Sequence, residues 1–230
     1  MKKLLLLGLL AFFGSEALAQ SFRFGAKGGF NYADVNGKKL NDKAHDSKLG
    51  WHAGVMVNIQ YPGNDWFSLQ PELQYTRKGY EQLGTAFNIT NSQGNVLYTE
   101  KHNALVRFNY LELPFMFNFR TGILVFEAGP TLSYLVGADS DAFITQTLPD
   151  GTETSIELPD PGNERDKLSK FDYGAAAGLR LETENGAALG LRFSQNFRKV
   201  YDHNDPAIVN PYTNARNQVF QLYISYLIPE

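Results

Sequence analysis

The chain has 230 residues, a formal net charge of −3 and no cysteine. The absence of cysteine excludes disulfides, thiolate metal sites and a lipid anchor attached through cysteine. The weakly acidic balance provides no basic face for nucleic acid, so no nucleic-acid partner is expected. The length suits a single all-β domain.

The first residues have the composition of a secretory leader. Two lysines follow Met1, an apolar run covers residues 4–13, and Ala17-Leu18-Ala19 has the small-x-small form of a cleavage site. The apolar run is shorter than the roughly 20 residues that a membrane-spanning helix needs. We therefore expect residues 1–19 to be a cleaved signal peptide and residues 20–230 to form the mature domain.

Large apolar residues alternate with small or polar ones in eight later segments. In chain order they lie near residues 21–35, 51–61, 67–76, 110–119, 124–134, 171–182, 187–198 and 219–228. In the fourth segment, Leu111, Leu113 and three phenylalanines, at positions 115, 117 and 119, form an unbroken apolar face. Lipid can cover such a face without a further protein layer, so we expect apolar side chains outside and polar ones inside.

This alternation predicts how the chain crosses a membrane. No later segment approaches 18 consecutive apolar residues, so strands must do the crossing. Backbone polar groups in lipid must pair within the protein, which only helices and closed barrels achieve. We therefore predict an all-β fold, an eight-stranded antiparallel up-and-down transmembrane β-barrel in the cell outer membrane. A soluble sandwich or a lipocalin-like barrel with an apolar interior is the alternative.

The connections between segments alternate between short and long. Short turns are expected at residues 62–65, 120–122 and 184–186, the last containing the hairpin dipeptide Asn185-Gly186. Long connections cover about residues 36–47, 82–99, 139–167 and 202–215. Short periplasmic turns and longer external loops are typical of outer-membrane barrels. We expect the four long loops to form one external crown.

Three prolines fall inside the predicted strands. Proline lacks the N–H that a neighbouring strand would use, so Pro71, Pro114 and Pro130 predict a β-bulge or an earlier strand end.

Tyrosines and tryptophans near strand ends are expected to supply the interfacial aromatic girdles, namely Trp51, Tyr61, Trp66, Tyr75, Tyr80, Tyr110, Tyr134, Tyr201 and Tyr226.

Four blocks of sequence carry a family resemblance. They are Leu-Gln-Pro-Glu-Leu-Gln-Tyr-Thr-Arg-Lys-Gly at residues 69–79, Tyr-Leu-Glu-Leu-Pro-Phe at 110–115, Glu-Ala-Gly-Pro-Thr-Leu-Ser-Tyr at 127–134 and Phe-Asp-Tyr-Gly-Ala-Ala-Ala-Gly at 171–178. In these blocks the chain resembles the PorT-type outer-membrane β-barrel family common in Bacteroidota. The resemblance implies an OmpA-like eight-stranded barrel, often labelled porin-like, and no catalytic set. The chain departs from the usual outer-membrane ending, because Pro229 and Glu230 follow the last aromatic residue, Tyr226.

The inward faces of the expected strands carry charges of both signs. These residues are Arg23, Lys27, His52, Glu72, Glu112, Glu127, Asp172, Arg180, Glu182, Arg192 and Arg198. An eight-stranded barrel is just wide enough for side chains to fill it, and unpaired buried charges are costly. We therefore expect a paired structural network, with a narrow channel for small solutes lined by the same residues as the alternative. A wide diffusive porin is not expected, because such porins use about 16–18 strands.

Catalytic and metal-binding patterns are weak. His45, His102 and His203 fall in or beside the long loops and His52 faces the upper lumen, but no spacing links them to a serine and a carboxylate. We predict no catalytic residues and no cofactor, and an enzyme at the barrel rim is the weakest alternative.

The 139–167 loop is rich in carboxylates, namely Asp139, Asp141, Asp150, Glu153, Glu157, Asp160, Glu164 and Asp166. They could bind calcium or magnesium bridged to lipopolysaccharide, but their spacing does not match a calcium loop. We expect a solvated, mobile loop and no metal site. The leading hypothesis is a structural or surface-interaction role through the external loops. The expected partners are outer-membrane lipid and lipopolysaccharide, with protein partners at the external loops.

Overall fold

The computed structural model describes residues 21–36, 45–82, 84, 86–157, 168–200 and 216–229. The expected leader, His203, Tyr201 and three of the loop carboxylates, Asp160, Glu164 and Asp166, lie outside the described residues. Within the described ranges, no helix is long and apolar enough to cross a membrane.

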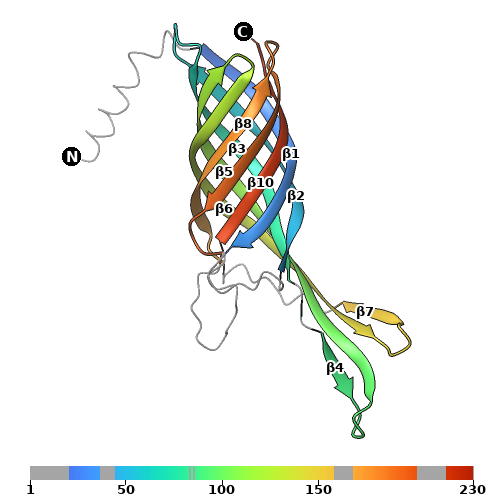
Figure 1. Ribbon diagram of the computed structural model, residues 1–230. Coiled ribbons are helices and arrows are strands. Elements are labelled where there is room, and N and C mark those ends of the chain that lie inside the picture. Colours follow the sequence, from blue (N-terminus) through green and yellow to red (C-terminus); the bar gives the residue numbers. More distant parts are fainter. Residues whose placement is uncertain are drawn as a thin grey trace, which may run out of the picture.

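The described strands form one antiparallel sheet that closes into a barrel (Figure 1). They are β1 (Ser21–Asn36), β2 (His45–Gln60), β3 (Phe67–Gln82), β4 (Phe87–Thr90), β5 (Val96–Thr121), β6 (Leu124–Thr147), β7 (Glu153–Glu157), β8 (Phe171–Glu182), β9 (Ala187–Asn196) and β10 (Arg216–Leu227). Eight of them form the ring, in the order β1, β2, β3, β5, β6, β8, β9 and β10, because β5 pairs with β6 and β10 pairs with β1. The prediction of an eight-stranded antiparallel barrel is confirmed.

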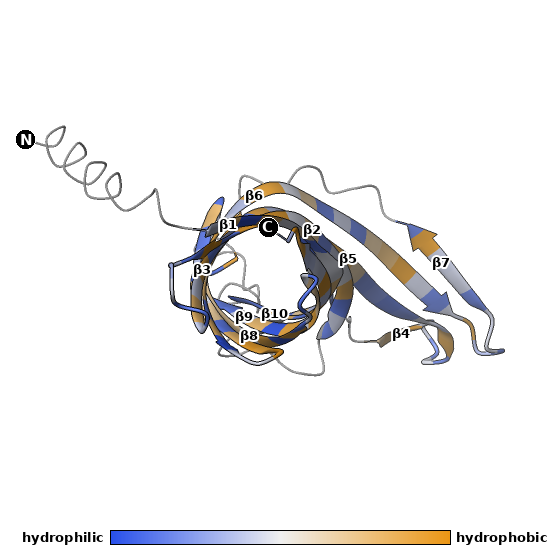
Figure 2. Cartoon of the chain, turned by 90° about the horizontal axis from the view of Figure 1, so that it is seen from above, coloured by the Kyte–Doolittle hydropathy of each residue, from blue (hydrophilic) through white to orange (hydrophobic). Residues whose placement is uncertain are grey.

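Side-chain burial follows the sequence alternation on each ring strand. In β8, Phe171, Tyr173 and Leu181 are exposed on the outer wall, whereas Asp172 and Arg180 are buried inside. Figure 2 looks along the barrel and shows hydrophobic and hydrophilic residues alternating along the strands. The outer wall therefore has the apolar character that lipid requires, and the polar residues are enclosed.

The three predicted short turns are present, and each has a glycine with positive φ. Gly63, Gly122 and Gly186 have φ of 72°, 60° and 86°, values that side-chain-bearing residues rarely adopt. These turns lie at the end of the barrel where the chain terminates, which we call the turn end (Figure 1). The opposite end is called the loop end.

The prolines do not interrupt the strands as predicted. Pro71 is in register with Phe115, and Pro130 is in register with Ala175, with one register kept on both sides of each. Pro114 is likewise in register with Thr131. The expected bulges or strand ends are therefore wrong at all three positions. A missing N–H removes a hydrogen bond toward only one neighbouring strand, so the pairing on either side of it can hold the strand in place.

Two of the predicted long loops contain β-strands over about half of their length. β5 and β6 continue beyond the ring and, together with β4 and β7, form a four-stranded extension that leans away from the barrel (Figures 1 and 2). The expected loops at residues 82–99 and 139–167 are thus wrong over much of their length. These segments are polar, so they resemble loops in sequence, but pairing between Thr99–Ala104 and Ala142–Thr147 makes them strands.

Tight turns close the two tips of the extension. Gly94 and Gly151 have φ of 85° and 87°. At the second tip, the backbone N–H of Thr152 donates to Asp150 Oδ1 at 2.8 Å, and this bond lowers the pKa of the Asp150 carboxyl. The carboxylates of this region are therefore partly ordered. Asp141, for example, is ion-paired with Arg107.

An apolar cluster lies inside the barrel at the loop end. It contains Tyr80, Phe108, Tyr110, Leu135, Leu168 and Val200, all at most 5% exposed. Tyr80 and Tyr110 were expected in the aromatic girdle, and that expectation is wrong because their strand positions point inward. Trp51, Tyr75, Tyr134 and Tyr226 do lie exposed on the outer wall, and Tyr61 and Trp66 are exposed in the turn between β2 and β3.

Candidate functional site: the charged lumen

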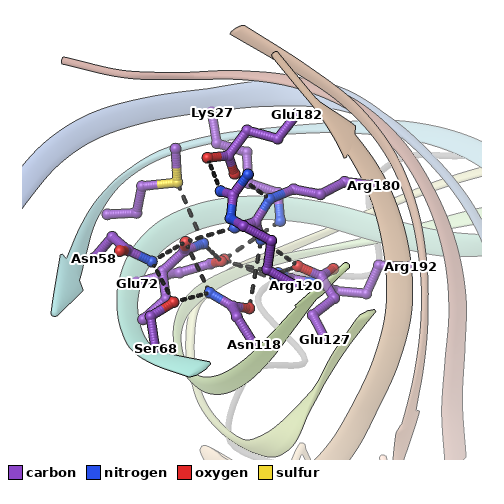
Figure 3. Close-up of polar contacts among 12 residues, drawn as sticks. Lys27, Asn58, Ser68, Glu72, Asn118, Arg120, Glu127, Arg180, Glu182 and Arg192 are labelled. Atoms are coloured by element: carbon purple, nitrogen blue, oxygen red, sulfur yellow. Dashed lines mark hydrogen bonds and ion pairs between the residues drawn. The ribbon is translucent and has the colours of Figure 1, made fainter. Parts of the chain in front are cut away.

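The centre of the barrel is occupied by Arg192 and two glutamates (Figure 3). Arg192 on β9 donates to both oxygens of Glu72 on β3, at 2.7 and 2.8 Å. It also donates to both oxygens of Glu127 on β6, at 2.6 and 2.9 Å. All three side chains are at most 2% exposed. One guanidinium therefore joins three strands across the lumen.

A second guanidinium continues the network toward the turn end. Arg180 donates to Glu127 at 3.1 Å and to Glu182 at 2.9 Å. Its remaining donors reach the side-chain oxygens of Gln70 at 3.3 Å and Asn118 at 3.4 Å. Two further arginines pair with Glu182 at the turn end: Arg23, at 3.0 Å, and Arg120. Carboxylates and guanidinia therefore alternate along this half of the lumen.

Lys27 and Tyr223 fill the side of the lumen next to Glu72. The Lys27 ammonium lies 3.4 Å from Glu72 Oε2 and 3.7 Å from the centre of the Tyr223 ring. The ring thus supplies a cation–π contact in addition to the ion pair.

His52 lies in the half of the lumen nearer the loop end, where the side-chain amide of Asn31 holds it. Its Nδ1 is 2.7 Å from Asn31 Oδ1, while Asn31 Nδ2 donates to the backbone carbonyls of Trp51 and Arg77. The other ring nitrogen of His52, Nε2, is buried without a hydrogen-bond partner among the described residues. His52 therefore lies apart from the carboxylates of the network.

Glu112 anchors a smaller group near the loop end. It forms an ion pair with Lys78 and accepts hydrogen bonds from Gln74 and Thr76, both at 2.9 Å, and from Ser133 at 3.1 Å. The apolar cluster lies beyond this group. Tyr80 follows Lys78 by two residues on β3, and Tyr110 precedes Glu112 by two residues on β5.

Asp172 forms a separate contact with β9. Asn196 Nδ2 donates to it at 2.6 Å, and the backbone N–H of Arg198 donates at 3.2 Å. Arg198 lies just beyond the end of β9 and is only half-buried, unlike the other arginines of the predicted set on β8 and β9.

The structure brings together most of the charged residues that the sequence places inside. Arg192, Glu72, Glu127, Arg180 and Glu182 form one connected network, which Lys27 and Arg23 also join. Glu112, Asp172, His52 and Arg198 lie outside this network, in contacts of their own.

Sequence reasoning missed two cations. Lys78 and Arg120 each lie two residues beyond the last inward position assigned to their strands, Thr76 and Asn118. Extending the alternation by one more step on β3 and β5 would have identified both. The network therefore has more positive partners than the sequence analysis counted.

The histidines do not assemble a recognisable catalytic set. His102 on the extension lies 2.6 Å from Glu100 Oε1, and its ring stacks on Phe87 at 5.6 Å. No serine or threonine hydroxyl contacts His102 in the part of the chain that the structure describes. The side chain of His45 lies outside the described residues. Across the described ranges, no group of three acidic or histidine side chains could hold a metal ion.

Comparison with known proteins assigns a family to this closed barrel. Residues 18–202 match the family model described as an outer membrane protein beta-barrel domain. The chain belongs to this outer-membrane barrel family. Its location in the outer membrane, predicted from the strand pattern, is confirmed. No curated protein sequence matches the chain.

Solved structures of outer-membrane barrels are similar in fold at low identity. Ail of Yersinia pestis, solved with the heparin analogue sucrose octasulfate, is 11% identical, with 90% of this chain and 99% of that chain covered and a TM-score of 0.43. Neisserial surface protein A is 13% identical, with coverage of 90% and 97% and a TM-score of 0.37. OprG of Pseudomonas aeruginosa is 10% identical, with coverage of 92% and 98% and a TM-score of 0.34.

Proposed function

We propose that this outer-membrane protein has a structural or surface-interaction role at its loop end and that its lumen does not conduct. The observation that carries this proposal is the network around Arg192, which links strands on opposite sides of the ring. Because the charges have both signs and contact one another, few remain to attract a solute. An eight-stranded barrel offers little space beyond its side chains.

The apolar cluster supports the same proposal independently. Phe108, Tyr110 and Leu135 are at most 2% exposed at the loop end of the lumen. An ion that passed the charged network would next have to cross this apolar layer without its hydration shell. Such a constriction opposes conduction by dewetting. Two barriers of different chemistry therefore lie in series.

Conductance across a planar lipid bilayer tests the proposal directly. Purified full-length protein should insert without producing stable single-channel steps. Insertion is established separately by recovering folded protein from the bilayer-forming lipid, so silence cannot be attributed to missing protein. Reproducible steps of one amplitude would instead support the narrow-channel alternative for small solutes.

The extension is the element that we assign to partner proteins. One of its faces gathers Phe87, Ile89, Tyr98, Ile144 and Ile156, because strand pairing places these residues on the same side. The opposite face carries polar residues such as Thr145 and Ser155. The same pairing also places Glu100 and His102 on the first face. A single-layer sheet with such a cluster of apolar side chains and short exposed edge strands is suited to binding another protein.

We further propose that the protein is not an enzyme. Among the described residues, His102 and Glu100 come nearest to a catalytic pair, and the stacking of Phe87 on His102 accounts for that position structurally. If the proposal is right, hydrolysis of generic peptide and lipid ester substrates will stay at background. Activity that disappears in a His102→Ala variant would contradict it.

Two narrower proposals complete the assignment. Within the family, we propose a PorT-type barrel of the kind common in Bacteroidota, supported by four sequence blocks that lie on the consecutive ring strands β3, β5, β6 and β8. Joint retention of these blocks in aligned homologues would test it. We also propose cleavage after Ala19, so that mass spectrometry of the mature protein should give a chain beginning at Gln20. A mature chain that keeps Met1 would contradict this.

A further inference from the structure

Positive charge exceeds negative charge in the connected lumen network. Among the described residues, ion pairs join five cations to three carboxylates, namely Arg23, Lys27, Arg120, Arg180 and Arg192 to Glu72, Glu127 and Glu182. The other buried carboxylates in the described ranges do not correct this balance. Glu112 is paired with Lys78, and Asp172 lies at the opposite end of β8 from Glu182. The network therefore carries two positive charges in excess.

The excess is located at the turn end. In the centre of the lumen, two cations and two carboxylates contact one another. At the turn end, three guanidinia converge on the single carboxylate of Glu182, and Figure 3 shows Arg120 and Arg180 beside it. Arg180 donates to its Oε2 at 2.9 Å, whereas Arg23, at 3.0 Å, and Arg120 both donate to its Oε1. One carboxylate cannot neutralise three guanidinia, so this end of the lumen attracts anions.

Two of these guanidinia are accessible. The side chains of Arg23 and Arg120 are 18% and 32% exposed, whereas those of Arg180 and Glu182 are at most 2% exposed. Each accessible guanidinium donates to Glu182 through one terminal nitrogen, and Nε of Arg23 is buried without a hydrogen-bond partner among the described residues. Asp65 lines the same small hollow as Arg120 but forms no ion pair with it in the described part of the chain. Hydrogen-bond donors therefore remain for a further anion.

We propose that Arg23 and Arg120 bind the phosphate group of a small soluble molecule at the turn end of the lumen. The planar guanidinium matches phosphate in shape and can donate two hydrogen bonds to it. A phosphate monoester carries about two negative charges near neutral pH, which matches the excess of the network, whereas a carboxylate carries one. Both arginines occupy inward strand positions, so they face the lumen and not the lipid around the barrel.

The site lies on the accessible side of both barriers in the lumen. The turn end of an outer-membrane barrel faces the periplasm. A phosphate from the periplasm therefore reaches Arg23 and Arg120 without crossing the network around Arg192 or the apolar cluster. This inference goes beyond the proposed function, because it holds for a lumen that does not conduct.

Trp66 makes the site measurable. Its backbone carbonyl accepts a hydrogen bond from the backbone N–H of Arg120 at 2.7 Å, and the chain contains only two tryptophans. A Trp51→Phe variant therefore leaves one reporter beside the site. In nonionic detergent at constant ionic strength, inorganic phosphate should give a saturable change in Trp66 emission, and acetate should bind several-fold more weakly. Isothermal titration calorimetry measures the same affinities without the reporter.

Two variants should change phosphate affinity in opposite directions. Arg23→Gln/Arg120→Gln should weaken it at least about tenfold, because a hydrogen bond to a charged group contributes about that much. Glu182 keeps its ion pair with Arg180 in this variant, so no carboxylate is left buried without a partner. Glu182→Gln should strengthen phosphate binding several-fold, because it releases both accessible guanidinia and removes a competing negative charge.

A matched control separates the site from general charge. Lys101→Gln/Arg216→Gln removes the same number of positive charges from β5 beyond the ring and from the first residue of β10, away from the turn end. Phosphate affinity should stay unchanged in this variant. Heat-modifiable gel migration establishes that each variant is a folded barrel.

The source of the phosphate is tested by repeating the titration in phosphatidylcholine nanodiscs, where both ends of the barrel stay accessible. The affinity for inorganic phosphate should equal that in detergent. Loss of binding in nanodiscs would mean that a lipid headgroup occupies the site, and the assignment to a soluble molecule would be wrong.

Three further results would overturn the proposal. The first is unchanged phosphate affinity in Arg23→Gln/Arg120→Gln, or an equal loss in Lys101→Gln/Arg216→Gln. The second is weaker or unchanged phosphate binding in Glu182→Gln. The third is equal affinity for acetate and phosphate, which would show that the site does not select the phosphate group.

Discussion

Arg192 and Glu72 hold opposite walls of the barrel together. They lie on β9 and β3, which are separated by three strands in both directions around the ring, and they share two hydrogen bonds of 2.7 and 2.8 Å. Neither strand could form this contact through backbone pairing, so the bond acts across the lumen. Two nitrogens of the guanidinium donate to the two oxygens of one carboxylate, a bidentate geometry that makes an ion pair strong.

This contact predicts a stability pattern specific to buried charge. Arg192→Met should lower the free energy of unfolding by about 3–5 kcal/mol, because Glu72 and Glu127 would stay buried without their main counter-charge. The double variant Arg192→Met/Glu127→Gln should restore most of that loss, because Glu72 keeps its pairing with Lys27 and Arg180 keeps its pairing with Glu182. Urea unfolding in lipid vesicles, followed by tryptophan fluorescence, measures both.

The exposed Arg216 provides the control for that comparison. Arg216→Met should change the free energy of unfolding by no more than about 0.5 kcal/mol. If Arg192→Met/Glu127→Gln is as unstable as Arg192→Met alone, the loss is due to packing and not to unpaired charge.

The two barriers in the lumen predict that single changes stay silent in conductance. Glu127→Ala removes one side chain of the charged network and widens the space there. The apolar cluster stays in place, so no channel steps are expected. Phe108→Ala/Tyr110→Ala opens the cluster but leaves the network intact and should also be silent. Only the combination of all three, with Arg192→Ala added, should conduct in a planar bilayer. Steps from either partial variant would show that the barrier it retains does not block conduction by itself.

Gly190 predicts a test of packing beneath the network. A Cβ built there would lie 2.3 Å from Cζ of Tyr223, whose ring makes the cation–π contact with Lys27. Gly190→Ala should therefore cost about 1–3 kcal/mol in unfolding free energy, as overpacking does. In a Tyr223→Ala background the same substitution should cost almost nothing.

Gly28→Ala is the matched control for this packing test. A Cβ at Gly28 meets only the His52 carbonyl oxygen, at 3.6 Å, which is ordinary contact. Its unfolding curve should overlay that of the wild type. Equal losses for Gly28→Ala and Gly190→Ala would indicate a general cost of alanine in these strands instead of a clash with Tyr223.

The extension predicts side-specific contact with a partner. A photo-crosslinking amino acid in place of Ile156, on the apolar face, should give a discrete crosslinked product on intact cells. The same amino acid in place of Ser155, the adjacent residue on the polar face, should give none. Crosslinks of equal yield from both positions would contradict binding through the apolar face.

The sequence by itself determined the number of ring strands, their boundaries at the turn end and, within the predicted segments, the side on which most residues lie. Alternation has a period of two, so once one face must meet lipid, every other side chain is assigned. The short turns were equally predictable, because glycine is needed where φ is positive, as at Gly122 and Gly186.

Only the tertiary structure decided which inward charges meet. The pairing of Arg192 with Glu72 depends on ring closure, which brings residues 120 positions apart in sequence into contact. Closure also determined that Tyr80 and Tyr110 form an internal apolar layer and that polar segments beyond the ring pair as an extension. Local sequence carries no signal for such contacts, because their partners are chosen by position around the barrel and not by neighbours along the chain.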